Sequence, residues 1–87
     1  MRLDAVFWDY PRFVDEAVVR QTLAEKRGTF VYSWMLARLL ERGRAVDTMA
    51  LVPLAEIAQA VREAKISDRA RRKWRRLVEA YGAAAGG

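Results

Sequence analysis

Cysteine and histidine are both absent from this chain of 87 residues. The lack of cysteine excludes disulfide bonds and thiolate metal sites and is typical of a reducing compartment, so we expect the cytoplasm. The lack of histidine removes the commonest metal ligand and the usual general base near neutral pH. We therefore expect no metal, no cofactor and no enzymatic activity. An enzyme would have to work with Asp9 and the tyrosines, and no motif brings these residues together.

Long hydrophobic runs are absent as well. The longest run without a formal charge is residues 28–37, far short of the roughly 20 apolar residues that a membrane span needs. The N-terminal segment carries Asp4 and Asp9 and has no apolar stretch of signal length, so we expect no secretory signal. Glycine-rich phosphate loops are also missing.

Glycine and proline are few, with five and two residues, and they divide the chain into segments with helical patterns. The segments predict four helices, at residues 12–27, 30–42, 53–64 and 68–81. Residues 3–10 predict a loop or a short strand, and in the connection after residue 43 Asp47 can cap a short turn. The expected fold is all-α, a small single-domain bundle of about four helices over residues 1–82, with a disordered tail at residues 83–87.

Capping residues mark the ends of the predicted helices. Thr29 and Ser67 are good N-caps for the second and the fourth helix. Gly28 and Gly43 can end the first two helices, and Gly28 can do so in the left-handed conformation. Asp15 is expected in the first turn of the first helix, where a negative charge is favoured.

Positive charge is concentrated in the last helical segment. The net charge of the chain is +5, and residues 65–81 hold seven bases and two acids, whereas residues 1–64 hold nine of each. Three interpretations stay open: a solvated helix face, a site for an acidic protein partner, or a site for nucleic acid. Trp74 lies on the apolar stripe of this segment and is expected in the core. The candidate binding residues are Arg69, Arg72, Lys73 and Arg76.

The last two predicted helices resemble a helix-turn-helix. The first has the pattern Leu-x-x-Ile-Ala from Leu54 to Ala58, an Ile-Ser turn follows, and the second is basic. Two features depart from that motif. The turn looks longer than the usual three to four residues and has no glycine, and no Asn, Gln, Ser or Thr follows Ser67. Arg and Lys alone favour contact with phosphates or an acidic protein over the reading of base edges.

The second predicted helix is apolar on nearly every side over residues 30–37. Such a helix is buried on every side, which is hard to achieve in so short a chain. It is either a central core helix, or a helix with one face in the core and another in a partner. The candidate partner contacts are Tyr32, Trp34 and Met35, together with Phe7 and Trp8.

The sequence "FWDY" at residues 7–10, and the pair Ile66-Ser67 followed by Trp74, resemble a family of short, uncharacterised prokaryotic proteins. Members open with Phe-Trp-Asp and close with Leu/Ile-Ser…Phe/Tyr-Trp on a terminal helix. The resemblance covers about residues 6–78, although Lys73 stands where the family has an aromatic residue. Genes of this family often lie beside a nucleotidyltransferase-like toxin of the abortive-infection type, which implies an antitoxin or accessory role.

These observations favour a non-enzymatic protein-binding module, most concretely an antitoxin. Its expected partner is the cognate toxin or another protein, bound through the apolar helix. The alternative is a helix-turn-helix-like transcriptional regulator that binds operator DNA with the basic helix. No membrane contact is expected, and a homodimer is left open.

Overall fold

The computed structural model describes the backbone of residues 1–86 and the side chains of residues 1–82. This part of the chain contains five α-helices, one short 3-10 helix and no strand: η1 (Pro11–Val14), α1 (Glu16–Glu25), α2 (Phe30–Arg42), α3 (Ala45–Leu51), α4 (Leu54–Glu63) and α5 (Asp68–Gly86). The all-α class is confirmed, with one helix more than predicted. Residues 3–10 form turns, so the loop interpretation of this segment is correct. The predicted tail, residues 83–87, includes Gly87, which lies outside the described residues.

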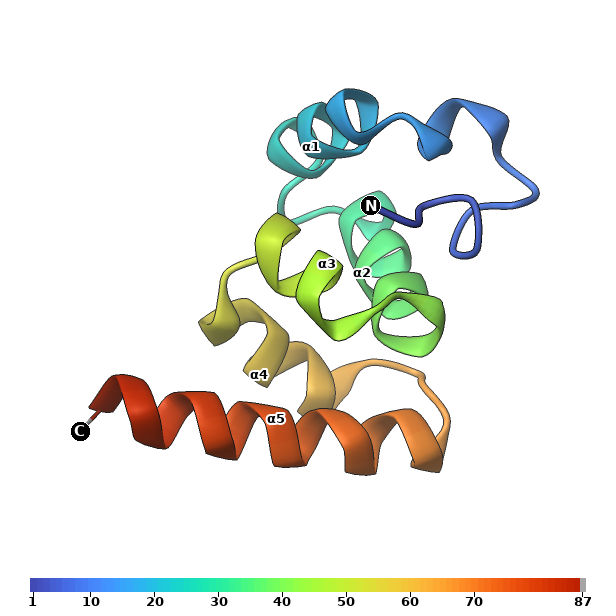
Figure 1. Cartoon of the computed structure of the whole chain (residues 1–87). Coiled ribbons are helices and arrows are strands. Elements are labelled where there is room, and N and C mark those ends of the chain that lie inside the picture. Colours follow the sequence, from blue (N-terminus) through green and yellow to red (C-terminus); the bar gives the residue numbers. More distant parts are fainter. Residues whose placement is uncertain (87) are drawn as a thin grey trace.

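Helix α2 lies in the middle of the molecule (Figure 1). The N-terminal segment and α1 lie on one side of it, and α4 and α5 lie on the other. Four side chains of α2 are buried, namely Met35, Leu36, Leu39 and Leu40, and apolar side chains from the N-terminal segment, α1, α4 and α5 pack around them. The interpretation of α2 as a central core helix is therefore correct for its second half.

The first helix begins later than predicted because two residues divide its expected start. Pro11 opens the short 3-10 helix, and Asp15 then adopts an extended conformation with φ −87° and ψ 119°. The carboxylate of Asp15 accepts a hydrogen bond from the backbone N–H of Ala17 at 2.8 Å. Asp15 is thus the N-cap of α1 and not a residue of its first turn. At the other end α1 stops at Glu25 with Lys26 as its C-cap, two residues earlier than predicted. Gly28 has the predicted left-handed conformation, with φ +81°, but lies in the turn after the cap.

Helix α3 occupies the segment predicted as a connection. Its residue Thr48 is fully buried, and the Thr48 hydroxyl donates to the carbonyl of Arg44 at 3.0 Å. A Cβ on Gly43 would lie 2.6 Å from the carbonyl oxygen of Leu39 and 2.9 Å from Oγ1 of Thr48. Gly43 has φ −81°, so the close approach of α3 to α2 requires glycine here, and backbone conformation does not. Asp47 lies inside α3 and accepts a hydrogen bond from the backbone N–H of Arg2 at 3.1 Å.

Helix α5 is fastened to the body of the molecule at its N-terminal end. The hydroxyl of Ser67 accepts from the N–H of Ala70 at 3.1 Å, which confirms the predicted N-cap. The same hydroxyl donates to the Glu41 carboxylate at 2.8 Å. Trp74 is fully buried, as predicted, and its indole N–H donates to the carbonyl of Leu40 at 2.8 Å.

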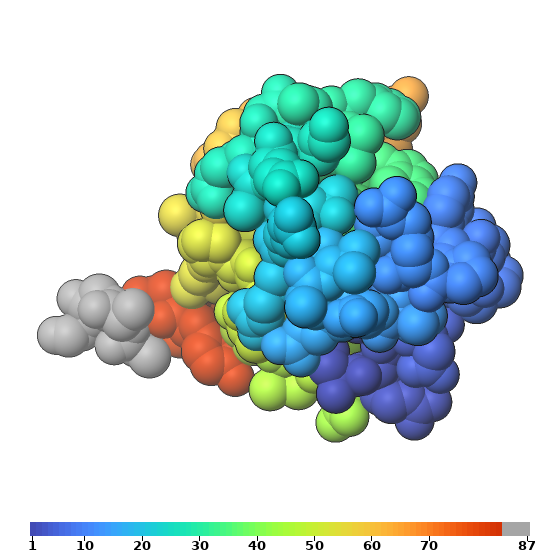
Figure 2. Space-filling model, turned by 90° about the horizontal axis from the view of Figure 1, so that it is seen from above, coloured from blue at the N-terminus to red at the C-terminus, as the bar shows by residue number. Residues whose placement is uncertain are grey.

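Helices α4 and α5 lie side by side and run in opposite directions (Figure 1). Residues 64–67 join them, so the connection is four residues long, and the expectation of a turn longer than three to four residues is wrong. Helix α5 continues past Gly82, its predicted end, to Gly86, and the part of α5 that ends at residue 82 already projects from the body of the molecule (Figure 2). No helix in the described part of the chain has the length and apolar character needed to span a bilayer.

Candidate functional site

A groove of about 640 Å³ lies between α2 and α4. Its apolar lining includes Leu36 and Ala37 from α2, and Ala60 and Ala64 from the end of α4. The short alanine side chains at the end of α4 leave this space open, and a larger side chain there would fill it. We call this feature the α2–α4 groove.

Phe30 lines the α2–α4 groove and is 81% exposed. It is the first residue of α2, and Thr29 holds the N-cap position before it. The Thr29 hydroxyl does not cap the helix as predicted, because it donates to the carbonyl of Lys26 at 2.6 Å. Phe30 and the apolar groove lining form one exposed apolar patch, and such patches mark ligand-binding grooves or interaction surfaces. Phe30 was not among the predicted partner contacts, although its place directly after the N-cap is a signal that few core neighbours surround it.

The charged residues around the α2–α4 groove balance one another. Arg27 forms an ion pair with Glu56, and the Tyr32 hydroxyl donates to the same carboxylate at 2.9 Å. Burial, followed by this hydrogen bond, raises the pKa of Tyr32 to about 12. The remaining charged residues of the lining, Glu63 and Lys65, have opposite signs. The groove is therefore apolar inside and near neutral at its edge.

The predicted partner contacts divide into buried and accessible residues. Phe7 and Met35 are fully buried, so they act through the core and do not face a partner. Tyr32 and Trp34 are half-buried, and both line the α2–α4 groove. Trp8 is 57% exposed and does not line the groove. Two of the five predicted residues therefore meet at one surface.

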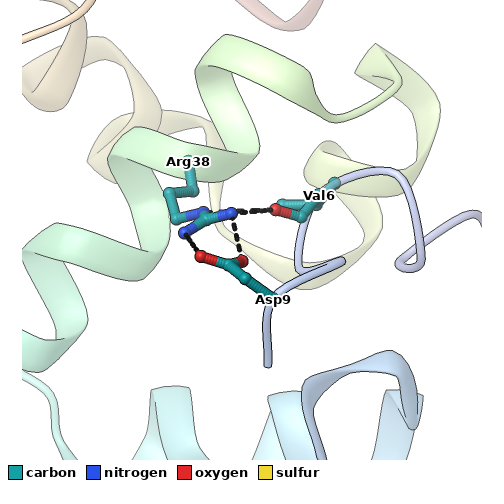
Figure 3. Close-up of polar contacts among 3 residues, drawn as sticks. All are labelled: Val6, Asp9 and Arg38. Carbon is teal, nitrogen blue, oxygen red and sulfur yellow. Dashed lines mark hydrogen bonds and ion pairs between the residues drawn. The ribbon is translucent and has the colours of Figure 1, made fainter. Parts of the chain in front are cut away.

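Asp9 and Arg38 fasten the N-terminal segment to α2 (Figure 3). The Arg38 guanidinium donates to both carboxylate oxygens of Asp9, at 2.7 and 3.1 Å. It also donates to the carbonyl of Val6 at 2.9 Å. These hydrogen bonds hold the pKa of Asp9 below its ordinary value. Asp9 is thus an ionised carboxylate paired with Arg38 and not the desolvated acid that a proton-transfer site needs.

Trp8 lies against two arginines of α2. The guanidinium carbon of Arg38 is 4.6 Å from the Trp8 ring centroid, and that of Arg42 is 4.5 Å away. Both distances fall within the range of cation–π contact. More than half of the Trp8 surface still faces solvent.

The basic residues of α5 have two different roles. Arg71 is half-buried and donates to the carbonyls of Val61 and Ala64, so it caps the C-terminal end of α4. The four predicted binding residues are all exposed, and none of them belongs to an ion pair among the described residues. Spacings of three and four place them on one side of α5. We call this set the basic face: Arg69, Arg72, Lys73 and Arg76.

A second, shallower hollow of about 470 Å³ adjoins the basic face at the start of α5. Its lining includes Arg42 of α2 together with Arg69 and Lys73 of α5. The acid in this lining, Glu41, is already engaged by the N–H and the hydroxyl of Ser67. Three cations from two helices therefore converge on one surface hollow.

Comparisons of the chain with protein-family models, with curated proteins and with solved structures find no match. Within the described residues, no group of three or more acidic side chains is arranged to hold a metal ion. The arrangement of the side chains therefore carries the functional argument. It presents two surfaces, the near-neutral α2–α4 groove and the basic face.

Proposed function

We propose that this chain is a non-catalytic protein-binding module that receives an amphipathic helix of a partner protein in the α2–α4 groove. The observation that carries the proposal is Phe30, which is 81% exposed on the lining of the groove. Burying a phenylalanine side chain stabilises a complex by about 1.5–3 kcal/mol. An apolar groove between two helices is a common docking place for the apolar side of a third.

The proposed partner is a toxin, and the chain is its antitoxin. The resemblance of residues 6–78 to a family encoded beside nucleotidyltransferase-like toxins supports this choice. The structural support is the apolar α2–α4 groove with its near-neutral edge. An antitoxin has to present an adhesive surface and needs no chemistry of its own.

The test is calorimetric titration of the purified protein with the product of the neighbouring gene. Phe30→Ser is expected to weaken binding about thirtyfold, the effect typical of an aromatic hot spot. Val46→Ser is the matched control, because Val46 is 61% exposed on α3 and lies outside the groove lining. No heat of binding with the unmodified protein, or equal losses in the two variants, would show that the proposal is wrong.

A second candidate function is nucleic-acid binding through the basic face, as in a helix-turn-helix-like regulator of the chain's own operon. The specific observation that favours it is four exposed cations on one side of α5, none of which forms an ion pair with a described residue. A mobility shift compares the upstream DNA with a random duplex at two salt concentrations. Specific retention of the upstream DNA is the expected result for an operator-binding protein, and no shift at low salt excludes this function.

A further inference from the structure

We infer that the basic face and Trp8 together form a binding site for single-stranded nucleic acid, in which the cations hold phosphates and Trp8 stacks on a base. The inference rests on the second candidate function above and specifies which form of nucleic acid is bound. Its carrying observation is that one exposed aromatic ring and five cations form a continuous surface across α2 and α5.

Arg42 makes the surface continuous. Its guanidinium carbon lies 4.5 Å from the Trp8 ring centroid, and it lines the same hollow as Arg69 and Lys73. Arg72 and Arg76 extend the cations along α5, and at 1.5 Å per residue the charged part of this helix spans about 10 Å. A strand that follows this path meets an aromatic ring at one end and cations over the rest.

Nearby acids neutralise this path only in part. The Glu41 carboxylate accepts hydrogen bonds from Ser67 and keeps its charge, so Arg42, Arg69 and Lys73 with Glu41 give the hollow a net charge of +2. The Asp9 carboxylate is paired with Arg38. Asp68 lies four residues before Arg72 and Glu79 three residues after Arg76, so both acids are neighbours of the path along α5, but neither forms an ion pair with a base of α5 among the described residues. The cations of the path are thus free to pair with phosphates of a ligand.

The Trp8 ring favours a single strand over a duplex. Bases in a duplex are stacked on one another and cannot reach a side chain, whereas unpaired bases stack on exposed aromatic rings. Helix α5 also has no Asn, Gln, Ser or Thr in its described length to read base edges in a groove. Charge plus one stacking ring is the usual composition of a site that grips single strands with little regard to sequence.

Fluorescence anisotropy with the full chain tests the inference. The probes are a labelled oligo(dT) of about twelve nucleotides and a duplex of equal length. The single strand is expected to bind more tightly, and Trp8→Ala is expected to weaken its binding at least fivefold, as for the loss of one stacked base. The double variant Arg69→Gln/Lys73→Gln is expected to lower the salt slope by about 1.4, which corresponds to two lost phosphate contacts.

Arg75→Gln is the matched control on the same helix, because Arg75 is exposed but lies off the side that carries Arg69 and Lys73. It is expected to leave the salt slope within error of the unmodified protein. Acrylamide quenching of tryptophan fluorescence in the unmodified protein needs no substitution, so its result does not depend on whether a variant folds. Trp34 is half-buried and Trp74 is fully buried, so acrylamide quenches mainly Trp8, and bound oligo(dT) is expected to protect this emission.

The outcomes separate the inference from the function on which it rests. Tighter binding of oligo(dT), with loss in Trp8→Ala and protection from acrylamide, supports the site. Equal binding of strand and duplex, with no effect of Trp8→Ala, overturns the single-strand inference and leaves nucleic-acid binding standing. No binding of either probe at low salt overturns both, and it leaves the basic face to an acidic protein.

Discussion

At the α2–α4 groove the chain exposes apolar area and pairs its charges, whereas along α5 it buries apolar area and leaves its charges unpaired. Phe30 is 81% exposed at the groove, and Trp74 is fully buried under the basic face. Arg27 has an acidic partner in Glu56, and the ion pairs among the described residues include no base of α5.

The difference indicates how each surface would respond to its surroundings. Contacts in the groove depend on apolar burial, which salt screens little. Contacts on the basic face depend on charge, which is screened over about 8 Å at physiological ionic strength. One small bundle can therefore bind two ligands of different chemistry, and a substitution can alter one surface without altering the other.

Trp74→Ala is expected to have the largest effect, because Trp74 joins α5 to α2 and so supports both surfaces. The change leaves a cavity and removes the hydrogen bond to the carbonyl of Leu40. Its expected cost is about 3–5 kcal/mol, out of a total near 5–15 kcal/mol for a typical domain. Urea unfolding followed by circular dichroism measures it. If Trp74→Ala were unfolded by circular dichroism but one surface still bound its ligand, the two surfaces would not belong to one cooperative unit.

Gly43→Ala is expected to destabilise the end of α2 that carries Arg42, because its Cβ would collide with Leu39 and Thr48. Overpacking of this kind costs about 1–3 kcal/mol. Gly82→Ala is the control, since a Cβ at Gly82 meets nothing within 4 Å and alanine is favoured inside a helix by about 0.5–1 kcal/mol. Thermal melting of the two variants should therefore shift in opposite directions, and equal shifts would contradict this account of Gly43.

Asp9→Asn is expected to loosen the N-terminal segment and Trp8 in a pH-dependent manner. Hydrogen bonds from Arg38 hold the pKa of Asp9 below 3.8 in the folded chain. A lowered folded-state pKa means that the contribution of Asp9 is present above about pH 4 and is lost as pH falls through the folded value. The difference in unfolding free energy between wild type and variant should thus shrink in acid. A difference that grows below pH 4 would contradict the ion pair.

Phe30→Ser is expected to have the smallest effect on stability, within about 0.5 kcal/mol, because the side chain is exposed. Phe30→Ser should instead change the retention of the protein on a chromatography resin. The variant should elute earlier from a hydrophobic-interaction resin and unchanged from heparin. Arg69→Gln/Lys73→Gln should show the reverse pattern, and a change on both resins in either variant would mean that the surfaces are not independent.

The features that were predictable from the sequence depend on neighbours along the chain. The helical patterns, the left-handed Gly28, the Ser67 cap and the burial of Trp74 all follow from local spacing and residue type. The concentration of positive charge in the last helix could likewise be read directly.

The features that escaped prediction depend on contacts between distant segments. Helix α3 packs against α2 with Thr48 close to Gly43, and that close approach has no signal in the sequence of α3 itself. The groove forms only where α2 and α4 meet, so the place of Phe30 after the N-cap could indicate its exposure but not the surface to which it belongs. Arg71 resembles the other bases of its run, and only the position of α4 reveals its separate role.

The role of Arg71 predicts how the basic run can change in evolution. A guanidinium reaches the carbonyls of Val61 and Ala64 with two nitrogens at once, and a lysine ammonium has no planar fork with which to do so. Substitution of Lys for Arg should therefore be neutral at the exposed positions Arg69, Arg72 and Arg76. The same substitution should be selected against at Arg71. A run that looks uniform in charge thus contains one position whose chemical identity is constrained by the helix before it.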